Sequence, residues 1–197
     1  YQGEEIGMTN APFMRIEDYK DIQTINMYYK RVFENGYDPE EVMTSILAKS
    51  RDHARTPMQW SSGKNAGFTD GTPWLKVNPN YTSINAEEAE ADPDSILAYY
   101  KKVISLRKQY ADLIKGSYDL LVPDDPQLFV YVRENGRQKL LAVNNFSKEK
   151  AVFQWPERCS KDQASLLLSN YKNNGDIADE MVFQPYESRV YLLNTRE

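Results

Sequence analysis

Residues 127–146 read QLFVYVRENGRQKLLAVNNF, and this stretch decides the fold of the second half of the chain. Two runs in which apolar residues recur at every second position flank Asn135-Gly136. A period of two is typical of a half-buried β-strand, and Asn-Gly between two such runs is a strong signal for a tight hairpin turn. The stretch therefore predicts two antiparallel strands.

Short runs of the same kind continue on both sides of this hairpin. After Gly116 they read SYDLLV, QLFVYVR, KLLAVNNF, KAVFQW, SLLLS, MVFQ and ESRVYLL, with turn residues between them. Seven short strands at close spacing favour an antiparallel sandwich or Greek-key module over residues 116–197. Trp155 is the only tryptophan in this half, so we expect a module that packs rather than one that stacks on sugars.

Residues 1–115 follow a different pattern. Three segments carry apolar residues at helical spacing: 17–35, 38–49 and 95–110. Asp38, followed by proline, is a typical N-cap for the second of them. Residues 61–94 are interrupted throughout by glycine and proline and predict a long loop, whose aromatic residues we expect to form its own small core. The predicted class is α+β, with a boundary near residue 115.

Composition excludes several function classes. The net charge is -5 with acids and bases interspersed, which argues against nucleic acid as a partner. No apolar run approaches the roughly 18 residues of a membrane span, so we expect no membrane association. Cys159 is the only cysteine, which excludes an internal disulfide and agrees with a cytoplasmic location. The chain opens on Tyr1 without a methionine, and we interpret it as a C-terminal piece of a longer protein.

Four motifs occur in a fixed order along the first half: YQGEEIGMTN, RDHARTPMQW, NAGFTDGTPW and VNPNY. Together they resemble the C-terminal third of the family 13 α-glucosidases, the group of oligo-1,6-glucosidases, dextran glucosidases and trehalose-6-phosphate hydrolases. The resemblance runs through residue 110 and continues more loosely beyond it. It implies that residues 1–115 supply the end of the last strand, a long insertion and the last helix of a (β/α)₈ barrel. Residues 116–197 would form the antiparallel C-terminal domain.

The resemblance also implies an activity for the parent protein. It is that of a retaining exo-α-glucosidase that releases glucose from short α-1,6-linked oligosaccharides, with trehalose-6-phosphate hydrolysis as the alternative within the family. The alternative from a different functional class is that residues 116–197 form a non-catalytic module, which either binds carbohydrate or packs against the rest of the protein. No cofactor is expected, because carboxylates suffice for this chemistry. The expected partner is an oligosaccharide, and surfaces meant for the rest of a barrel could also support self-association.

The catalytic groups of this family are an aspartate nucleophile, a glutamate acid/base and a second aspartate, and the resemblance places all three before Tyr1. Glu4 and Glu5 cannot replace them if they are neighbours on a strand, because their side chains would then point to opposite faces. Retaining glycosidases need two carboxylates about 5 Å apart across one bond. We therefore expect no catalytic residue in this chain.

Arg51, the first residue of RDHARTPMQW, is the main candidate for substrate binding. Its planar guanidinium offers five donors in a fixed fork, and the resemblance places it at the mouth of the glucose pocket. The alternative is a salt bridge to Asp52 or to a helix end. Gln23 is a second candidate, because relatives tend to carry glutamate at that position. Glutamine would free the guanidinium for substrate, whereas the alternative is an ordinary surface position.

The other polar residues of these motifs are expected to have structural roles. Glu4, Asp52 and Arg55 would shape the rim of the barrel, Glu4 by accepting from loop amides and Arg55 by bracing the loop. His53 is the only histidine and has no cysteine nearby, so the sequence predicts no metal site there.

Overall fold

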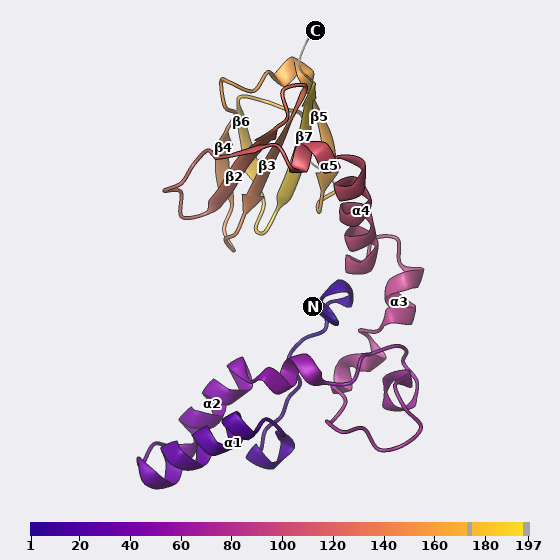
Figure 1. Ribbon diagram of the computed structural model, residues 1–197, viewed down its shortest axis with the longest axis vertical. Helices are drawn as coiled ribbons and strands as arrows, with labels where there is room; N and C mark the ends of the chain where they lie inside the picture. Colours follow the sequence, from indigo (N-terminus) through magenta and orange to yellow (C-terminus); the bar gives the residue numbers. More distant parts are fainter. Residues whose placement is uncertain (173–174, 195–197) are drawn as a thin grey trace. The chain divides into compact units, whose positions relative to one another are not determined.

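The computed structural model describes residues 1–172 and 175–194. Contacts divide the chain into two compact units, Tyr1–Lys101 and Lys102–Glu197 (Figure 1). This division falls before the boundary predicted near residue 115, because the second unit includes the later part of the helix α4 (Ile96–Gln109) and the short helix α5 (Ala111–Ile114). Leu113 of α5 is buried against the strands, which explains why this helix belongs with them.

The second unit is an antiparallel β module, as the sequence predicts. Each of the seven predicted strands forms, and five of them make one sheet in the order β1-β2-β3-β7-β5, while β4 and β6 pair separately. The strands are β1 (Ser117–Leu120), β2 (Leu128–Glu134), β3 (Gln138–Asn145), β4 (Ala151–Gln154), β5 (Ala164–Ser169), β6 (Glu180–Phe183) and β7 (Ser188–Asn194). The hairpin at Asn135-Gly136 is confirmed, because Glu134 pairs with Lys139 and Gly136 has a φ of 84°.

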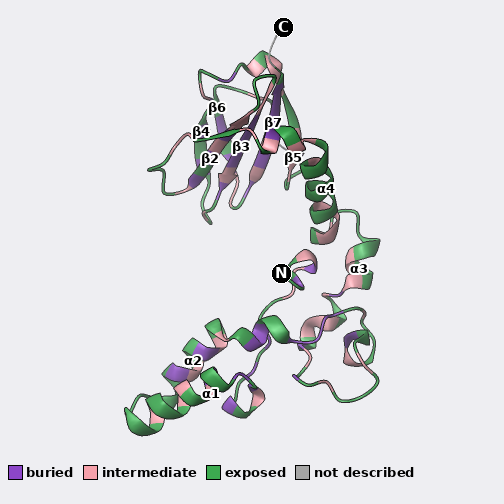
Figure 2. Cartoon of the chain, viewed as in Figure 1, coloured by how far each residue is buried: buried purple, intermediate pink, exposed green. Residues whose placement is uncertain are grey.

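The core of this module lies between the two sheets. The inward positions of β2, Leu128, Val130 and Val132, pack with residues of β4 and β6, while the intervening positions face outward. In Figure 2 the buried residues of this unit lie mainly along the strands. Trp155 is buried in the same core, and its indole N–H donates to the carbonyl of Cys159 at 2.5 Å. It is therefore part of the packing and not an exposed platform, in agreement with the structural role expected from the sequence.

A close approach at Gly116 gives a first testable prediction. A Cβ at this position would lie 2.1 Å from the carbonyl oxygen of Glu134 and 3.0 Å from that of Leu113. Because both are backbone atoms, Gly116→Ala should destabilise the β module by about 1–3 kcal/mol, measured by urea unfolding. Gly71→Ala is the matched control, since a Cβ there meets nothing closer than 3.6 Å. Equal stability of the two variants would contradict the prediction.

The first unit contains two helices that pack on one another, α1 (Ile22–Tyr29) and α2 (Pro39–Lys49). Asp38 caps α2 as predicted, and its carboxylate accepts from the Glu40 amide at 2.8 Å. The helix predicted over 17–35 begins later, at Ile22, because Asp21 is its N-cap, and it continues as a π-helical turn over Lys30–Glu34. Buried residues of this core include Phe13, Tyr19, Val42 and Ile46.

Two expectations about residues 61–94 are wrong. The segment contains a short helix, α3 (Ala86–Ala91), whose cap Asn85 accepts from the Glu88 amide at 2.9 Å. Trp60, Phe68 and Trp74 are exposed and do not form a core of their own. The loop is ordered by amide side chains instead, which donate to backbone carbonyls: Asn65 to Thr69 and Gly71, Gln59 to Ile84, Asn78 to Thr9 and Asn85 to Tyr81.

The predicted helix over 95–110 is confirmed as α4, but its apolar stripe is not covered. Ile96, Tyr100, Val103 and Ile104 are all exposed, and α4 has no buried residue within the part of the chain that the structure describes (Figure 2). Amphipathic helices of globular proteins normally bury such a stripe. The helix therefore presents a surface suited to further protein contacts.

Candidate functional site

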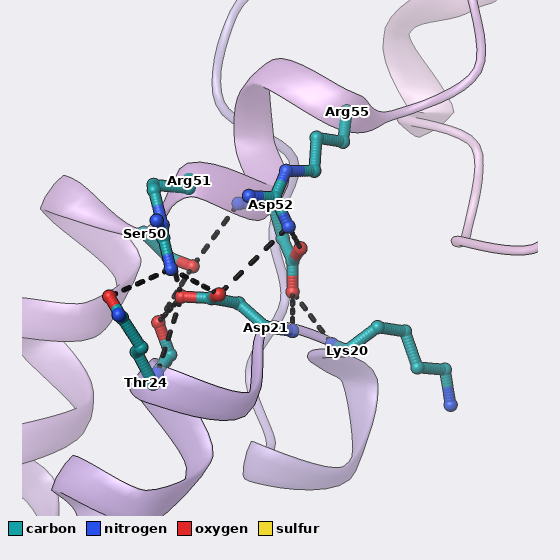
Figure 3. Close-up of polar contacts among 8 residues, drawn as sticks. Lys20, Asp21, Thr24, Ser50, Arg51, Asp52 and Arg55 are labelled. Carbon is teal, nitrogen blue, oxygen red and sulfur yellow. Dashed lines mark hydrogen bonds and ion pairs between the residues drawn. The ribbon is translucent and has the colours of Figure 1, made fainter.

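The candidate site is built where two capped helical segments meet. Asp21 caps α1, and its carboxylate accepts from the amide of Thr24 at 3.3 Å and from the Thr24 hydroxyl at 2.8 Å. Ser50 follows α2 and caps a 3₁₀ helix, Arg51–Arg55, by accepting from the Asp52 amide at 3.3 Å. The Thr24 and Ser50 hydroxyls lie 3.4 Å apart, so the two caps adjoin (Figure 3).

Arg51 is held along one edge of its guanidinium. Its Nη2 donates to Asp21 Oδ1 at 2.6 Å and to Gln23 Oε1 at 2.9 Å, and its Nε lies 3.4 Å from Asp21 Oδ2 (Figure 3). The side chain is 53% exposed, and Nη1 has no hydrogen-bond partner among the described residues. The ion-pair partner is therefore Asp21, at a helix end, and not Asp52. The free Nη1 leaves two donors available to a ligand.

Asp52 has a different function in this cluster. Its side chain is 0% exposed, and Oδ2 accepts from the backbone amides of Lys20 and Asp21 at 2.6 and 2.8 Å. Its Oδ1 lies 3.6 Å from Arg55 Nη1, and the same Nη1 lies 3.9 Å from Asp21 Oδ1. Arg55 thus lies between the two carboxylates, and Asp52 fastens the start of α1 to the 3₁₀ helix.

The protonation of Asp21 depends on this arrangement. Burial by itself raises the pKa of Asp21, but the hydrogen bonds from Arg51 and Thr24 and the charge of Arg51 outweigh it. The pKa of Asp21 therefore lies below its ordinary value of 3.8. The carboxylate stays ionised at neutral pH and remains a permanent counter-ion for Arg51.

This lowered pKa predicts how stability depends on pH. The folded pKa is below the unfolded one, so the stabilisation from ionised Asp21 is fully present above 3.8 and is lost as the pH falls through the folded value. In urea titrations from about pH 6 to pH 2.5, Asp21→Asn should be less stable than the wild type at the upper end. The gap should narrow below 3.8. A gap that does not change with pH would contradict the prediction.

Glu4 and Glu5 lie in a 3₁₀ helix, Glu4–Ile6, so the expectation that they are neighbours on a strand is wrong. Glu4 is exposed, and among the described residues no loop amide donates to its carboxylate. It is Glu5 that accepts from an amide, that of Gly3 at 2.8 Å. The positive φ of Gly3 and Gly7 on both sides produces this tight turn instead of a strand.

His53 packs between aromatic rings. Its ring stacks on Phe13 at a centroid distance of 5.6 Å and meets Tyr19 edge-on at 5.9 Å, and neither ring nitrogen has a hydrogen-bond partner among the described residues. Burial lowers the pKa of His53, although the charge of Asp52 acts in the opposite direction. Across residues 1–172 and 175–194, no group of three His, Cys, Asp or Glu side chains could hold a metal ion.

Comparison with known proteins decides the family. The sequence model of the α-amylase catalytic domain matches residues 1–116. The chain belongs to the α-amylase family. A second model, for the C-terminal domain of the α-amylase SusG, matches residues 128–190. The family resemblance inferred from the four motifs is thereby confirmed.

Individual α-amylase-family relatives are similar over nearly the whole chain. A probable oligo-1,6-glucosidase 2 of Bacillus subtilis is 82% identical over 194 residues, which are 98% of this chain and 34% of the relative. An oligo-1,6-glucosidase of Parageobacillus thermoglucosidasius is 51% identical with the same coverage. The crystal structure of Bacillus licheniformis trehalose-6-phosphate hydrolase matches with a TM-score of 0.92 at 43% identity, covering 99% of this chain and 35% of that one. The chain thus spans about a third of the length of the curated relatives it matches.

The structure brings together Gln23, Arg51, Asp52 and Arg55 of the predicted site residues, while Glu4 makes no hydrogen bond or ion pair with this cluster. Sequence reasoning missed Asp21, which makes the closest contact with Arg51. A signal existed, because an aspartate directly before the first apolar residue of a helical pattern is a typical N-cap. Placing the helix start at residue 17 concealed it.

No helix of the described residues is long and apolar enough to span a membrane.

Proposed function

We propose that this chain is the C-terminal part of a retaining exo-α-glucosidase that hydrolyses α-1,6-glucosidic bonds of short oligosaccharides. The observation that carries the proposal is the 82% identity to a probable oligo-1,6-glucosidase over 194 residues. The chemistry requires two carboxylates flanking one bond, and in this proposal they belong to the part of the parent protein that precedes Tyr1. The chain by itself should release no glucose.

The proposal assigns residues 1–115 to the catalytic barrel and residues 116–197 to the C-terminal domain. The family matches over 1–116 and 128–190 support this division. The uncovered apolar stripe of α4 supports it as well, because a barrel helix needs neighbours on that side. If those neighbours are missing, the same stripe would favour self-association.

The single cysteine, Cys159, supports a reducing, cytoplasmic location for the parent.

Arg51 is the residue of this chain that we assign to substrate binding. Its Nη1 has no hydrogen-bond partner among the described residues and its side chain is half exposed, so it can donate to hydroxyls of the leaving sugar. The expectation that glutamine at this position frees the guanidinium is wrong, because Gln23 Oε1 accepts from Arg51 Nη2 at 2.9 Å. Gln23 adds no charge, so among the described residues Asp21 is the one carboxylate hydrogen-bonded to Arg51. Arg55 lies between the carboxylates of Asp52 and Asp21 and so supports this arrangement.

The main experiment compares two substrates. The full-length protein is purified and its turnover of isomaltose and of trehalose 6-phosphate is measured. Turnover of isomaltose alone agrees with the proposal, whereas preference for trehalose 6-phosphate would establish the alternative. That alternative has its own support, since a trehalose-6-phosphate hydrolase of Bacillus subtilis is 42% identical over 195 residues.

A carbohydrate-binding β module is the alternative from another class. Burial of Trp155 removes the one tryptophan of that module as a stacking platform. Calorimetry of the chain with isomaltooligosaccharides distinguishes the two ideas. No binding heat is expected if residues 116–197 only pack against the rest of the protein, and measurable binding would favour the module.

A further inference from the structure

We propose that Asp21 and Asp52 are positioning residues that fix the direction in which Arg51 presents its free guanidinium edge to the leaving sugar. This inference rests on the proposed function and deepens it. Neither carboxylate is assigned to contact the substrate, because both are buried while Arg51 is exposed. Their effect on catalysis would pass through Arg51 alone.

The first step is the fixation of the backbone before α1. Asp52 Oδ2 accepts from two successive amides, those of Lys20 and Asp21, at 2.6 and 2.8 Å. These residues lie 32 and 31 positions away in the sequence. A fully buried carboxylate with two amide donors holds both segments rigidly, because releasing it would leave a charge and two donors without partners. Asp52 therefore sets where the backbone of Asp21 lies.

The second step is the fixation of the guanidinium. The Asp21 carboxylate uses both oxygens, one towards Arg51 Nη2 at 2.6 Å and the other shared by Arg51 Nε and Thr24. Thr24 thereby prevents rotation of the carboxylate, and the carboxylate prevents rotation of the planar guanidinium. Nη1 is the nitrogen left without a partner among the described residues, so only one edge is available to a ligand.

The third step is charge balance. Asp21 and Asp52 carry two negative charges, and Arg51 and Arg55 carry two positive ones, within the contacts described above. Gln23 adds an acceptor and no charge. When the charge of an arginine is already compensated, it binds a ligand more through directed hydrogen bonds than through long-range electrostatic attraction. The orientation of the guanidinium then decides how much it contributes to substrate binding. Binding through directed hydrogen bonds suits an uncharged sugar.

A double-mutant cycle on the full-length protein tests the inference. KM and kcat for isomaltose are measured for Asp52→Asn, Arg51→Ala and the double variant. Asp52→Asn should raise KM about tenfold, because the guanidinium loses its fixed direction. The double variant should have the KM of Arg51→Ala alone, since Asp52 has nothing left to position. If the KM of the double variant instead rises by the product of the two single factors, Asp52 acts independently of Arg51. That result would overturn the inference.

The outcomes separate this inference from the proposed function. If Arg51→Ala leaves KM unchanged, the proposed sugar contact fails and the inference fails with it. If Arg51→Ala raises KM but the effects of the two substitutions multiply, only the inference fails. Asp38→Asn is the matched control, because Asp38 is also a helix cap that accepts from an amide at 2.8 Å but precedes α2, outside the cluster. It should leave KM unchanged, and a rise as large as that of Asp52→Asn would count against positioning.

A second variant keeps the test decisive if Asp52→Asn does not fold. Thr24→Val removes the hydroxyl that donates to Asp21 at 2.8 Å and preserves the volume of the side chain. It loosens the Asp21 carboxylate while Asp52 stays in place. A raised KM that disappears in the Arg51→Ala background supports the inference. An unchanged KM, or an effect that persists without Arg51, overturns it.

Discussion

Glu187→Gln should destabilise the β module by about 3–5 kcal/mol, the usual effect of removing one partner of a buried ion pair. Glu187 is 0% exposed, and its Oε1 accepts from Arg189 Nε at 2.7 Å. Its Oε2 accepts from the amide of Gln184, also at 2.7 Å. Burial by itself lowers the pKa of Arg189, but the hydrogen bond from Arg189 to Glu187 raises it above its ordinary value, so the guanidinium stays charged. Without Glu187 that charge has no ion-pair partner among the described residues.

Urea unfolding followed through Trp155, which is buried in the same module, measures the effect. The double variant Glu187→Gln with Arg189→Met should recover most of the loss, since the buried charge is then absent and methionine can pack on Phe183, whose ring lies 4.5 Å from the guanidinium. Glu180→Gln, on the exposed β6 position, is the control and should change stability by less than about 0.5 kcal/mol. A midpoint for Glu187→Gln equal to that of the wild type would contradict the prediction.

The β module was the part of the fold most accessible to prediction. Alternation along 127–146 places Val130 and Val132 inward and Phe129 outward, and the turn at Asn135-Gly136 fixes the register of β2 and β3. Such local signals do not specify how distant strands combine. The pairing of β7 with both β3 and β5 depends on packing across the sheet, and no pattern within β7 indicates its two neighbours.

The first unit shows why aromatic residues in loops are harder to place. Trp60 and Trp74 look like a loop core in sequence, yet they are exposed, and amide side chains such as Asn65 and Asn78 order the segment. Hydrogen bonds from side chains to backbone carbonyls produce no repeating residue pattern, so they cannot be recognised in the sequence. The chain spans about a third of the length of its relatives, and in the proposal above further segments of a longer protein would cover these exposed aromatic side chains.

Of the residues that hydrogen-bond to Arg51, sequence reasoning named Gln23 and missed Asp21. The motif identified the arginine, but Asp52 follows it directly and was therefore the obvious ion-pair candidate. In the structure the Asp52 side chain turns to the amides of Lys20 and Asp21, which are more than thirty residues away. The packing of α1 against α2 and the hydrogen bonds that Asp52 accepts from these two amides together bring Asp21 to Arg51. Long-range contacts of this kind are decided by tertiary structure and are invisible to local patterns.

Arg51→Ala in the full-length protein should raise KM for isomaltose about tenfold to hundredfold while kcat changes much less. The expectation follows from the loss of a charged hydrogen-bond donor to the leaving sugar, an interaction of about 1.5–3 kcal/mol, with each 1.4 kcal/mol corresponding to about a factor of ten. Catalytic carboxylates on other strands would remain in place, so bond breaking should continue once substrate is bound. Initial-rate kinetics with isomaltose and with a longer isomaltooligosaccharide measure both constants.

Arg51→Lys sharpens this prediction, because it keeps the charge and removes the planar fork. A lysine can satisfy Asp21, but it cannot hold that carboxylate with two nitrogens and still direct a third towards a sugar. Its KM should therefore stay close to that of Arg51→Ala. Arg15→Ala is the control, since Arg15 is an exposed arginine of the same unit that, among the residues the structure describes, pairs with Glu17 alone, at 3.2 Å. Full recovery by lysine would mean that Arg51 acts as a charge alone, and unchanged kinetics in Arg51→Ala would remove it from the substrate site.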